Sequence, residues 1–204
     1  MTRDAAMRAY YDARAAEYDD FWLGTGLFAG RDRPGWDAER DALVAALAAL
    51  PAARTLDAAC GTAFLTRHLR GLVVGLDQSA RMAAIAQSRL PGGVAVVGDA
   101  LALPFAGGAF DRVLASHYYG HLRAGEREAF LAEARRVAPE LLVVDSAGED
   151  REDWQERKLN DGSRHRVYKR WFTPERLAAE LGGDAEVLHA GRWFVAVASR
   201  GSGS

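Results

Sequence analysis

The chain has almost no cysteine, few lysines and no long apolar run. Its single cysteine, Cys60, excludes an intramolecular disulfide framework and suits a reducing compartment. No apolar run approaches the roughly 20 residues that a membrane span needs, and the polar first residues do not resemble a secretion signal. The formal net charge of −2 gives no general attraction to nucleic acid or anionic lipid. We therefore expect a cytoplasmic protein that binds neither membranes nor nucleic acid.

The composition that is present suits one folded domain. The 204 residues are 49% hydrophobic and 26% charged, which excludes a disordered or fibrous chain. We expect a single domain over residues 1–200 and a flexible or added tail at 201–204. The five histidines are dispersed and no CxxC pair occurs, so no metal site is expected.

From residue 54 onward, short apolar segments alternate with helical patterns. The apolar segments are rich in β-branched residues and leucine, as in strands that are buried on both faces of a parallel sheet; they lie at 55–59, 72–76, 94–97, 112–115 and 141–144. Helices are expected at 62–70, at 79–90 with Ser79 as the N-cap, and at 125–137. This alternation predicts an α/β, doubly wound, Rossmann-like fold with a mostly parallel sheet of about seven strands.

The two ends of the chain follow other patterns. Residues 1–20 are expected to form one helix with Tyr11 and Tyr18 on one face, and the Gly-rich passage after it makes residues 1–35 a lid helix and loop. A second helix is expected at 37–50. Near the other end, Thr173-Pro174-Glu175 opens a helix, and the segments 186–189 and 193–198 predict an antiparallel hairpin at one sheet edge.

An insertion is expected between the parallel strands and this last part. Residues 147–172 contain the turn signal Asn160-Asp161-Gly162 between two possible short strands. We expect this segment to cover the substrate side of the binding face. Its cluster Arg164, Arg166, Lys169 and Arg170, interleaved with aromatic residues, is consistent with an anionic or aromatic substrate, and equally with a solvated strand face.

The most informative stretch is Leu56-Asp57-Ala58-Ala59-Cys60-Gly61-Thr62-Ala63, an apolar strand followed by an acid and small residues. Such a strand-to-helix turn allows a ligand close to the backbone and to free N–H groups. Asp77 ends the next strand and has the position of an acid that binds a ribose diol, while Asp99 ends the third. A dinucleotide fingerprint would need three glycines; Ala59 and Phe64 stand at two of those positions, and no Walker-type lysine is present.

At this point the sequence resembles the class I S-adenosylmethionine-dependent methyltransferases, in particular the small-molecule branch with the quinone-biosynthesis enzymes. The resemblance runs from about residue 10 to residue 198. It rests on five segments in the family's order: YYDARAAEYDDF, LDAACGTAFL, VVGLDQSARM, GDALALPFAGGAFDRVLAS and EARRVAPELLVVD. It implies S-adenosylmethionine as the cofactor.

The resemblance also implies roles for individual residues. Asp57 and the backbone of Ala59, Cys60 and Gly61 would hold the methionine end of the cofactor, and Asp77 would bind its ribose. Gln78 or Met82 would flank the adenine ring, and Asp99 with Ala100 would contact the adenine amino group. Ser116 and His117 would lie beside the reactive methyl, and Tyr11 and Tyr18 would close over the site. The chain departs from the family pattern at Ala59 and Ala63, where glycine is usual. Alanine keeps the turn possible if φ stays negative there.

Several of these residues have a structural alternative. Asp77 is also placed to cap the following helix, and Asp57 to hold the turn. His117 and His121 are candidates for a general base with a pKa suited to neutral pH, or for residues that only line the pocket. The sequence thus predicts a methyltransferase, monomeric or homodimeric, that acts on a small aromatic or apolar metabolite at oxygen, nitrogen or carbon. The alternatives are a nucleic-acid or protein methyltransferase and a silent cofactor-binding module.

Overall fold

Seven strands form one central sheet in the computed structural model, which describes residues 3–201. The strand order is β3-β2-β1-β4-β5-β9-β8. The first five strands are parallel, and β9 runs antiparallel to both β5 and β8, as predicted for the edge hairpin. The strands are β1 (Ala53–Ala58), β2 (Gly71–Asp77), β3 (Val94–Val97), β4 (Arg112–Ser116), β5 (Glu140–Ser146), β8 (Asp184–Ala190) and β9 (Phe194–Arg200).

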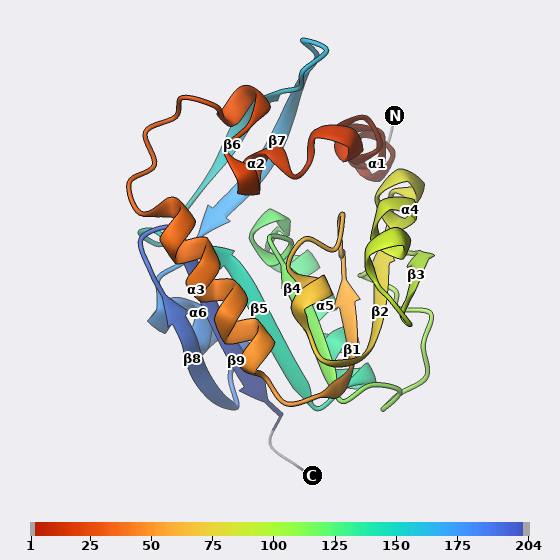
Figure 1. The fold of residues 1–204 in the computed structure, drawn as a ribbon. Coiled ribbons are helices and arrows are strands. Elements are labelled where there is room, and N and C mark those ends of the chain that lie inside the picture. The colour runs from red at the N-terminus through yellow and green to blue at the C-terminus, as the bar shows by residue number, and fades with distance from the viewer. Residues whose placement is uncertain (1–2, 202–204) are drawn as a thin grey trace.

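Helices cover both faces of this sheet, so the predicted doubly wound α/β fold is confirmed (Figure 1). α3 (Trp36–Ala49) and α4 (Ala80–Arg89) pack on one face, and α5 (Ala124–Val137) and α6 (Pro174–Leu181) pack on the other. Neighbouring strand residues alternate between the two cores: Val113 lies in the core under α5 and Leu114 in the core under α3. The central strands are therefore apolar on both faces.

The edge strand β3 differs from the expectation that all parallel strands are buried on both faces. Val94 and Val97 are 50% and 60% exposed. The reason is position in the sheet: β3 pairs only with β2 in the described sheet, so its outer side has no neighbour.

Two predicted helices are wrong in extent. Instead of a helix at 62–70, the chain forms only the 3-10 turn η3 (Thr66–His68), because Gly61 and Ala63 have positive φ values that an α-helix excludes. The single helix expected over residues 1–20 is α1 (Arg3–Arg14), the 3-10 turn η1 (Ala15–Glu17) and α2 (Asp20–Leu23). This break turns the chain so that Trp22 is buried against Phe64.

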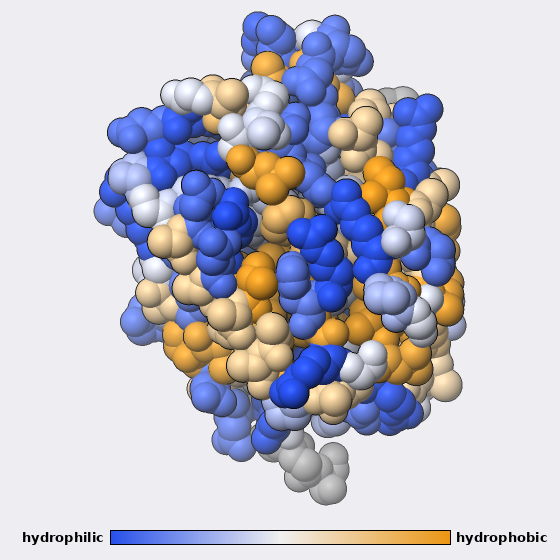
Figure 2. Space-filling view, viewed as in Figure 1, coloured by the Kyte–Doolittle hydropathy of each residue, from blue (hydrophilic) through white to orange (hydrophobic). Residues whose placement is uncertain are grey.

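A second, two-stranded sheet lies beyond the carboxyl ends of the parallel strands, beside α1 and α2 (Figure 1). Its strands β6 (Arg151–Lys158) and β7 (Arg164–Trp171) flank the predicted Asn160-Asp161-Gly162 turn. The tip of this hairpin and the loop between α2 and α3 carry mainly hydrophilic residues (Figure 2). Glu17 accepts a hydrogen bond from the Asn160 N–H at 2.8 Å, so the N-terminal segment and the hairpin contact each other. Most of the expected tail, residues 202–204, lies outside the described residues.

Candidate functional site

The turn after β1 is held by the neighbouring strand. The N–H groups of Ala59 and Cys60 both donate to the Leu76 carbonyl, at 2.8 and 2.9 Å, and the Gly61 N–H donates to the Asp77 carboxylate at 2.9 Å. These N–H groups are therefore not free for a ligand, contrary to the expectation for this turn. The small residues Ala59 and Gly61 still allow a ligand to come close to the backbone of the turn.

The backbone of this turn also differs from the prediction at both alanines. Ala59 and Ala63 have φ values of +70° and +57°, whereas the sequence analysis required negative φ. The tight reversal between β1 and the following segment forces the left-handed region, where a Cβ costs roughly 1–2 kcal/mol per residue. The alanines therefore occupy glycine-like positions with strain.

Asp77 supports the start of α4 through Ser79, which is the N-cap itself, and its carboxylate also faces a cavity. One carboxylate oxygen accepts from the Ser79 N–H at 2.9 Å, and the Ser79 hydroxyl caps α4 by accepting from the Met82 N–H at 3.1 Å. The carboxylate also lines a cavity at the ends of β1 and β2. Each carboxylate oxygen has a second lone pair, so both can still accept a ligand hydroxyl. Burial raises the pKa of Asp77 to about 6.

The other two acids lie at different depths. Asp99 is exposed at the same cavity, and its carboxylate accepts from the Leu101 N–H at 2.8 Å. Asp57 is fully buried beneath the turn and accepts from the Thr66 hydroxyl. Burial raises the pKa of Asp57 to about 7. Two of the three carboxylates therefore face one cavity, and the third supports the turn from below.

We call this space the turn cavity, and it brings together most of the predicted site residues. Those that line it are Tyr11, Tyr18, Ala59, Gly61, Asp77, Gln78, Asp99, Ala100, His117 and His121. Four predicted residues are not among its lining residues: Asp57, Cys60, Met82 and Ser116. Cys60 and Met82 are buried in the core, at 7% and 0% exposure, and burial raises the pKa of the Cys60 thiol.

Sequence reasoning missed several lining residues: Met7, Arg8, Leu76, Leu101, Tyr118, Leu122 and Glu126. A helical period would have found the first of them, since Met7 precedes Tyr11 by four residues on α1. Arg8 is the one arginine or lysine on the lining of the turn cavity among the described residues.

The N-terminal segment closes over the turn. Asp19 accepts from the Thr62 hydroxyl at 2.5 Å and forms an ion pair with Arg89 at 2.6 Å. The Tyr18 ring lies so close that a Cβ on Gly61 would meet it at 3.1 Å. Glycine at position 61 is thus required by both its φ of +53° and the ring packed against it.

His117 and His121 do not have the near-neutral pKa that a general base was expected to have. Burial lowers the pKa of His117 to about 3 and lowers the pKa of His121, so both imidazoles are neutral at physiological pH. His117 Nδ1 lies 3.5 Å from the Ser146 hydroxyl, while its buried Nε2 has no hydrogen-bond partner in the described structure. His121 Nδ1 lies 2.7 Å from the Tyr168 carbonyl.

A second, larger space of about 650 Å³ adjoins the first. We call it the hairpin chamber, because β6 and β7 form one wall and residues of α1, α2 and the loop before α3 form another. Ser146 lines the hairpin chamber and His117 lines the turn cavity, so their 3.5 Å contact marks the wall between the two spaces.

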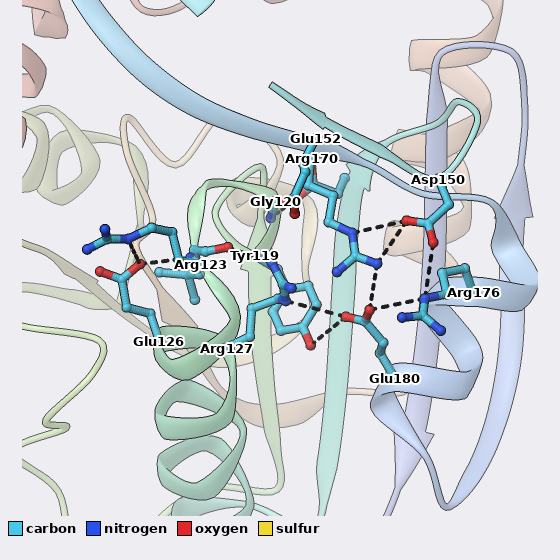
Figure 3. Close-up of polar contacts among 12 residues, drawn as sticks. Tyr119, Gly120, Arg123, Glu126, Arg127, Asp150, Glu152, Arg170, Arg176 and Glu180 are labelled. Carbon is cyan, nitrogen blue, oxygen red and sulfur yellow. Dashed lines mark hydrogen bonds and ion pairs between the residues drawn. The ribbon is translucent and has the colours of Figure 1, made fainter. Parts of the chain in front are cut away.

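The basic cluster of the hairpin fits neither sequence alternative as a whole. Arg164 and Arg166 are exposed, whereas Lys169 and Arg170 are 2% and 6% exposed. Lys169 forms a buried ion pair with Asp145, and Arg170 pairs with Asp150 and Glu180, each at 2.8 Å (Figure 3). Burial alone would raise the pKa of Asp145, but Lys169 brings it down to about 2.

Neither a metal-binding cluster nor a membrane-spanning helix is present among the described residues. No group of three or more histidine, cysteine, aspartate and glutamate side chains is placed to hold a metal ion within residues 3–201. In the same range no helix is both long enough and apolar enough to span a membrane.

Comparison with known proteins identifies the family. A methyltransferase-domain family model matches residues 56–140. Demethylmenaquinone methyltransferases are similar in sequence: that of Thermotoga maritima is 34% identical over 67% of this chain and 58% of its own length, and that of a Parafrankia species is 37% identical over 63% and 57%. The chain thus spans less than three-fifths of the length of these curated relatives.

Solved structures match over more of the chain. The structure titled "DhpI-SAM-HEP complex" is 27% identical, with a TM-score of 0.77 over 98% of this chain and 100% of that one. The structure titled "DhpI-SAH complex structure" is 28% identical, with a TM-score of 0.75 over 96% and 95%.

The turn cavity fits the cofactor named in these titles. It offers carboxylates at Asp77 and Asp99 for hydroxyl and amino donors, and a tight turn at Ala59 and Gly61 that lets a ligand approach the backbone. Its acidic side chains also suit a compound that carries a sulfonium and an ammonium charge. The chain belongs to the class I S-adenosylmethionine-dependent methyltransferases, and S-adenosylmethionine is its cofactor.

Proposed function

We propose that this protein transfers the methyl group of S-adenosylmethionine to a small molecule held in the hairpin chamber. The observation that carries the proposal is the contact between the two spaces, which share a wall at His117 and Ser146. The cofactor supplies an electrophilic methyl group on a sulfonium. In-line transfer then depends mainly on positioning, which accounts for on the order of 7–11 kcal/mol of such barriers.

The residues of the turn cavity are proposed to hold the cofactor in a fixed pose. Asp77 accepts from the ribose hydroxyls, and Asp99 accepts from the adenine amino group. Because the N–H groups of the turn are used within the fold, the methionine carboxylate needs another partner, and we assign it to the guanidinium of Arg8. His117 lies at the boundary where the methyl and the acceptor meet, and its imidazole is neutral, so it orients the acceptor rather than removing a proton.

A small acceptor is supported by the size of the hairpin chamber. Its volume of about 650 Å³ lies within the usual range of roughly 300–1,000 Å³ for small-molecule sites. A nucleic-acid substrate would favour a basic stripe on the open surface and a marked basic excess, and the net charge is −2. These features favour a metabolite over a macromolecule.

Calorimetric titration with S-adenosylhomocysteine, followed by an acceptor screen with methyl-labelled cofactor, tests the proposal. We expect saturable cofactor binding and label transfer to one class of small molecule, with mass spectrometry of compounds that co-purify with the protein narrowing the screen. Asp77→Ala is expected to weaken binding at least tenfold, while Asp184→Ala, at an exposed position on β8, leaves it unchanged. Absence of cofactor binding would contradict the proposal. Binding with no transfer to any acceptor class would identify a silent module instead.

A further inference from the structure

The hairpin chamber has a strong excess of positive charge. Eight lysine and arginine residues line it, against two glutamates. Two of the cations have carboxylate partners: Lys169 pairs with Asp145, and Arg164 pairs with Glu156. The other six form no ion pair with any described side chain, those of residues 5–201; they are Arg14, Arg31, Arg33, Arg157, Lys158 and Arg192.

Arg14 is the most significant of the unpaired cations, because it is buried. Its exposed fraction is 7%, its Nη1 donates to the Tyr10 hydroxyl at 2.9 Å, and its guanidinium lies over the Tyr18 ring at 4.9 Å. Burial raises the pKa of Tyr18, so this ring carries no negative charge to balance the guanidinium at neutral pH. A buried guanidinium with no counter-charge is unfavourable, and an anion bound beside it would supply that charge.

Arg14 also sits at the boundary between the two spaces. It lines the hairpin chamber, while Tyr18 beneath it lines the turn cavity. Arg157 on β6 lines the same chamber opposite His165 of β7, whose ring lies 4.9 Å from the ring of Tyr10, the hydroxyl partner of Arg14. Two unpaired guanidiniums therefore lie on the side of the chamber that the N-terminal segment and the hairpin share.

Several aromatic rings that line the chamber are covered by arginine side chains. Arg33 lies 4.0 Å from the ring centre of Trp36, and Arg31 lies 4.4 Å from that of Phe28. Arg192 lies 5.2 Å from the ring centre of Trp193. Guanidiniums that stack on rings in this way keep their N–H donors directed outward from the ring edge. These donors suit an oxyanion better than an apolar or purely aromatic acceptor.

We propose that the acceptor is a small organic anion, and that Arg14 and Arg157 bind its carboxylate or phosphate-type group. This inference rests on the proposed function, because it names the substrate class of the same site. Planar guanidiniums bind such oxyanions through paired N–H···O bonds, which fix orientation as well as affinity. The aromatic acceptor that the sequence predicts stays compatible with this inference, because a ring can carry the anionic group.

Probe binding to protein saturated with S-adenosylhomocysteine tests the inference. The anionic probes are phenyl phosphate and benzoate, and the neutral probes of similar shape are benzyl alcohol and benzamide. Tryptophan fluorescence reports occupancy, because Trp36, Trp171 and Trp193 line the chamber. We expect at least one anionic probe to bind saturably and at least tenfold more tightly than its neutral counterpart. Equal affinity for both would overturn the inference.

Charge variants locate the bound anion. Arg157→Gln and Arg14→Gln are each expected to weaken the anionic probe at least tenfold, and Arg14→Lys to restore part of the loss. The matched control is Arg166→Gln on the same hairpin, whose side chain is exposed over Trp154 and is not among the chamber's lining residues. If Arg14→Gln does not fold, the affinity of Arg157→Gln for the anionic probe tests the assignment by itself. Losses no larger than that of Arg166→Gln would refute the assignment.

The same samples separate the two proposals. Failure to bind S-adenosylhomocysteine would remove the proposed function and this inference together. Normal S-adenosylhomocysteine binding, with no preference for anionic probes, would remove this inference alone.

Discussion

Asp77 shows how one side chain serves folding and binding at once. Its two oxygens accept from the Gly61 and Ser79 N–H groups, which fixes the turn after β1 and the start of α4. The second lone pair of each oxygen remains available at the turn cavity. Burial disfavours the charged form, so the carboxylate is held ionised mainly by these donors.

Asp77→Asn should therefore weaken S-adenosylhomocysteine binding at least tenfold, because the amide nitrogen cannot accept from a hydroxyl; charge-assisted hydrogen bonds are worth roughly 1.5–3 kcal/mol each. In the native protein, affinity should be constant at high pH and fall as pH drops through about 6, because protonation of Asp77 removes acceptor capacity. Calorimetry between about pH 5 and pH 8, a range that brackets the Asp77 pKa of about 6, measures the affinity of the variant and the pH dependence of the native protein. The variant's weaker affinity should lose this pH dependence; retaining it would assign the titration to another group.

His117 provides a second test at this scale. It has a φ of +50° and a buried, neutral imidazole, so replacement by asparagine keeps a residue that tolerates this backbone. We expect His117→Asn to lower turnover at least tenfold and to leave S-adenosylhomocysteine affinity within about threefold, since the side chain orients the acceptor rather than the cofactor. His68→Asn, on η3 outside both cavities, is the control. Equal loss of affinity and turnover would point to a structural role.

At the scale of elements, the turn between β1 and η3 decides how the site forms. Ala59, Gly61 and Ala63 all have positive φ, so the chain cannot continue as a helix and instead brings its backbone to the cavity. The N-terminal segment is fixed on the far side of this turn through Asp19, Thr62 and Arg89. The turn therefore connects the sheet to the segment that covers the site.

Replacing the two alanines by glycine should have unequal effects. Ala59→Gly relieves a strain of roughly 1–2 kcal/mol and loses about 0.4–1 kcal/mol through the greater freedom of the unfolded chain, so the unfolding free energy should rise by about 0.5–1 kcal/mol. Ala63 is fully buried, and losing its methyl costs about 0.8 kcal/mol more. Ala63→Gly should therefore give no net gain. Urea denaturation measures both variants, and a stabilisation by Ala63→Gly equal to that by Ala59→Gly would contradict the argument.

Element existence was predictable where a segment's own pattern determined it. The strands around Leu56, Val74 and Val113 and the helix after Ser79 were found because burial on two faces and an N-cap leave clear signals. The absence of the helix predicted at 62–70 was not predictable in this way. Its residues have acceptable helix propensity, and the positive φ values arise only when the turn meets β2.

At the scale of the whole molecule, an ion cluster around Glu180 on α6 joins elements that are distant in sequence (Figure 3). Glu180 pairs with Arg170 of β7 at 2.8 Å and Arg127 of α5 at 3.5 Å, and accepts from the Tyr119 hydroxyl at 3.2 Å. This cluster fixes the end of β7 to α5 and α6, and so positions the wall of the hairpin chamber that β7 forms.

Glu180→Gln should accordingly lower the unfolding free energy by about 2 kcal/mol, because it removes the counter-charge of the buried Arg127 and leaves Arg170 with Asp150 alone. Glu156→Gln is the matched comparison, since its pair with Arg164 is more than 60% exposed on both sides. An exposed pair of that kind contributes about 0–1 kcal/mol. Chemical denaturation of both variants measures the difference, and equal losses would show that the cluster has no special role.

The sequence by itself determined the mostly parallel sheet, the succession of its strands along the chain, the family and most of the residues that line the turn cavity, because these depend on local periodicity and on motifs within single segments. Only the tertiary structure decided which charges line the hairpin chamber. Arg14 and Arg157 are 143 positions apart in the chain and line one chamber only because the N-terminal segment and the β6–β7 hairpin pack over the same end of the sheet. The charge environment of a cavity is a sum over distant residues and their partners, and no local pattern contains that sum.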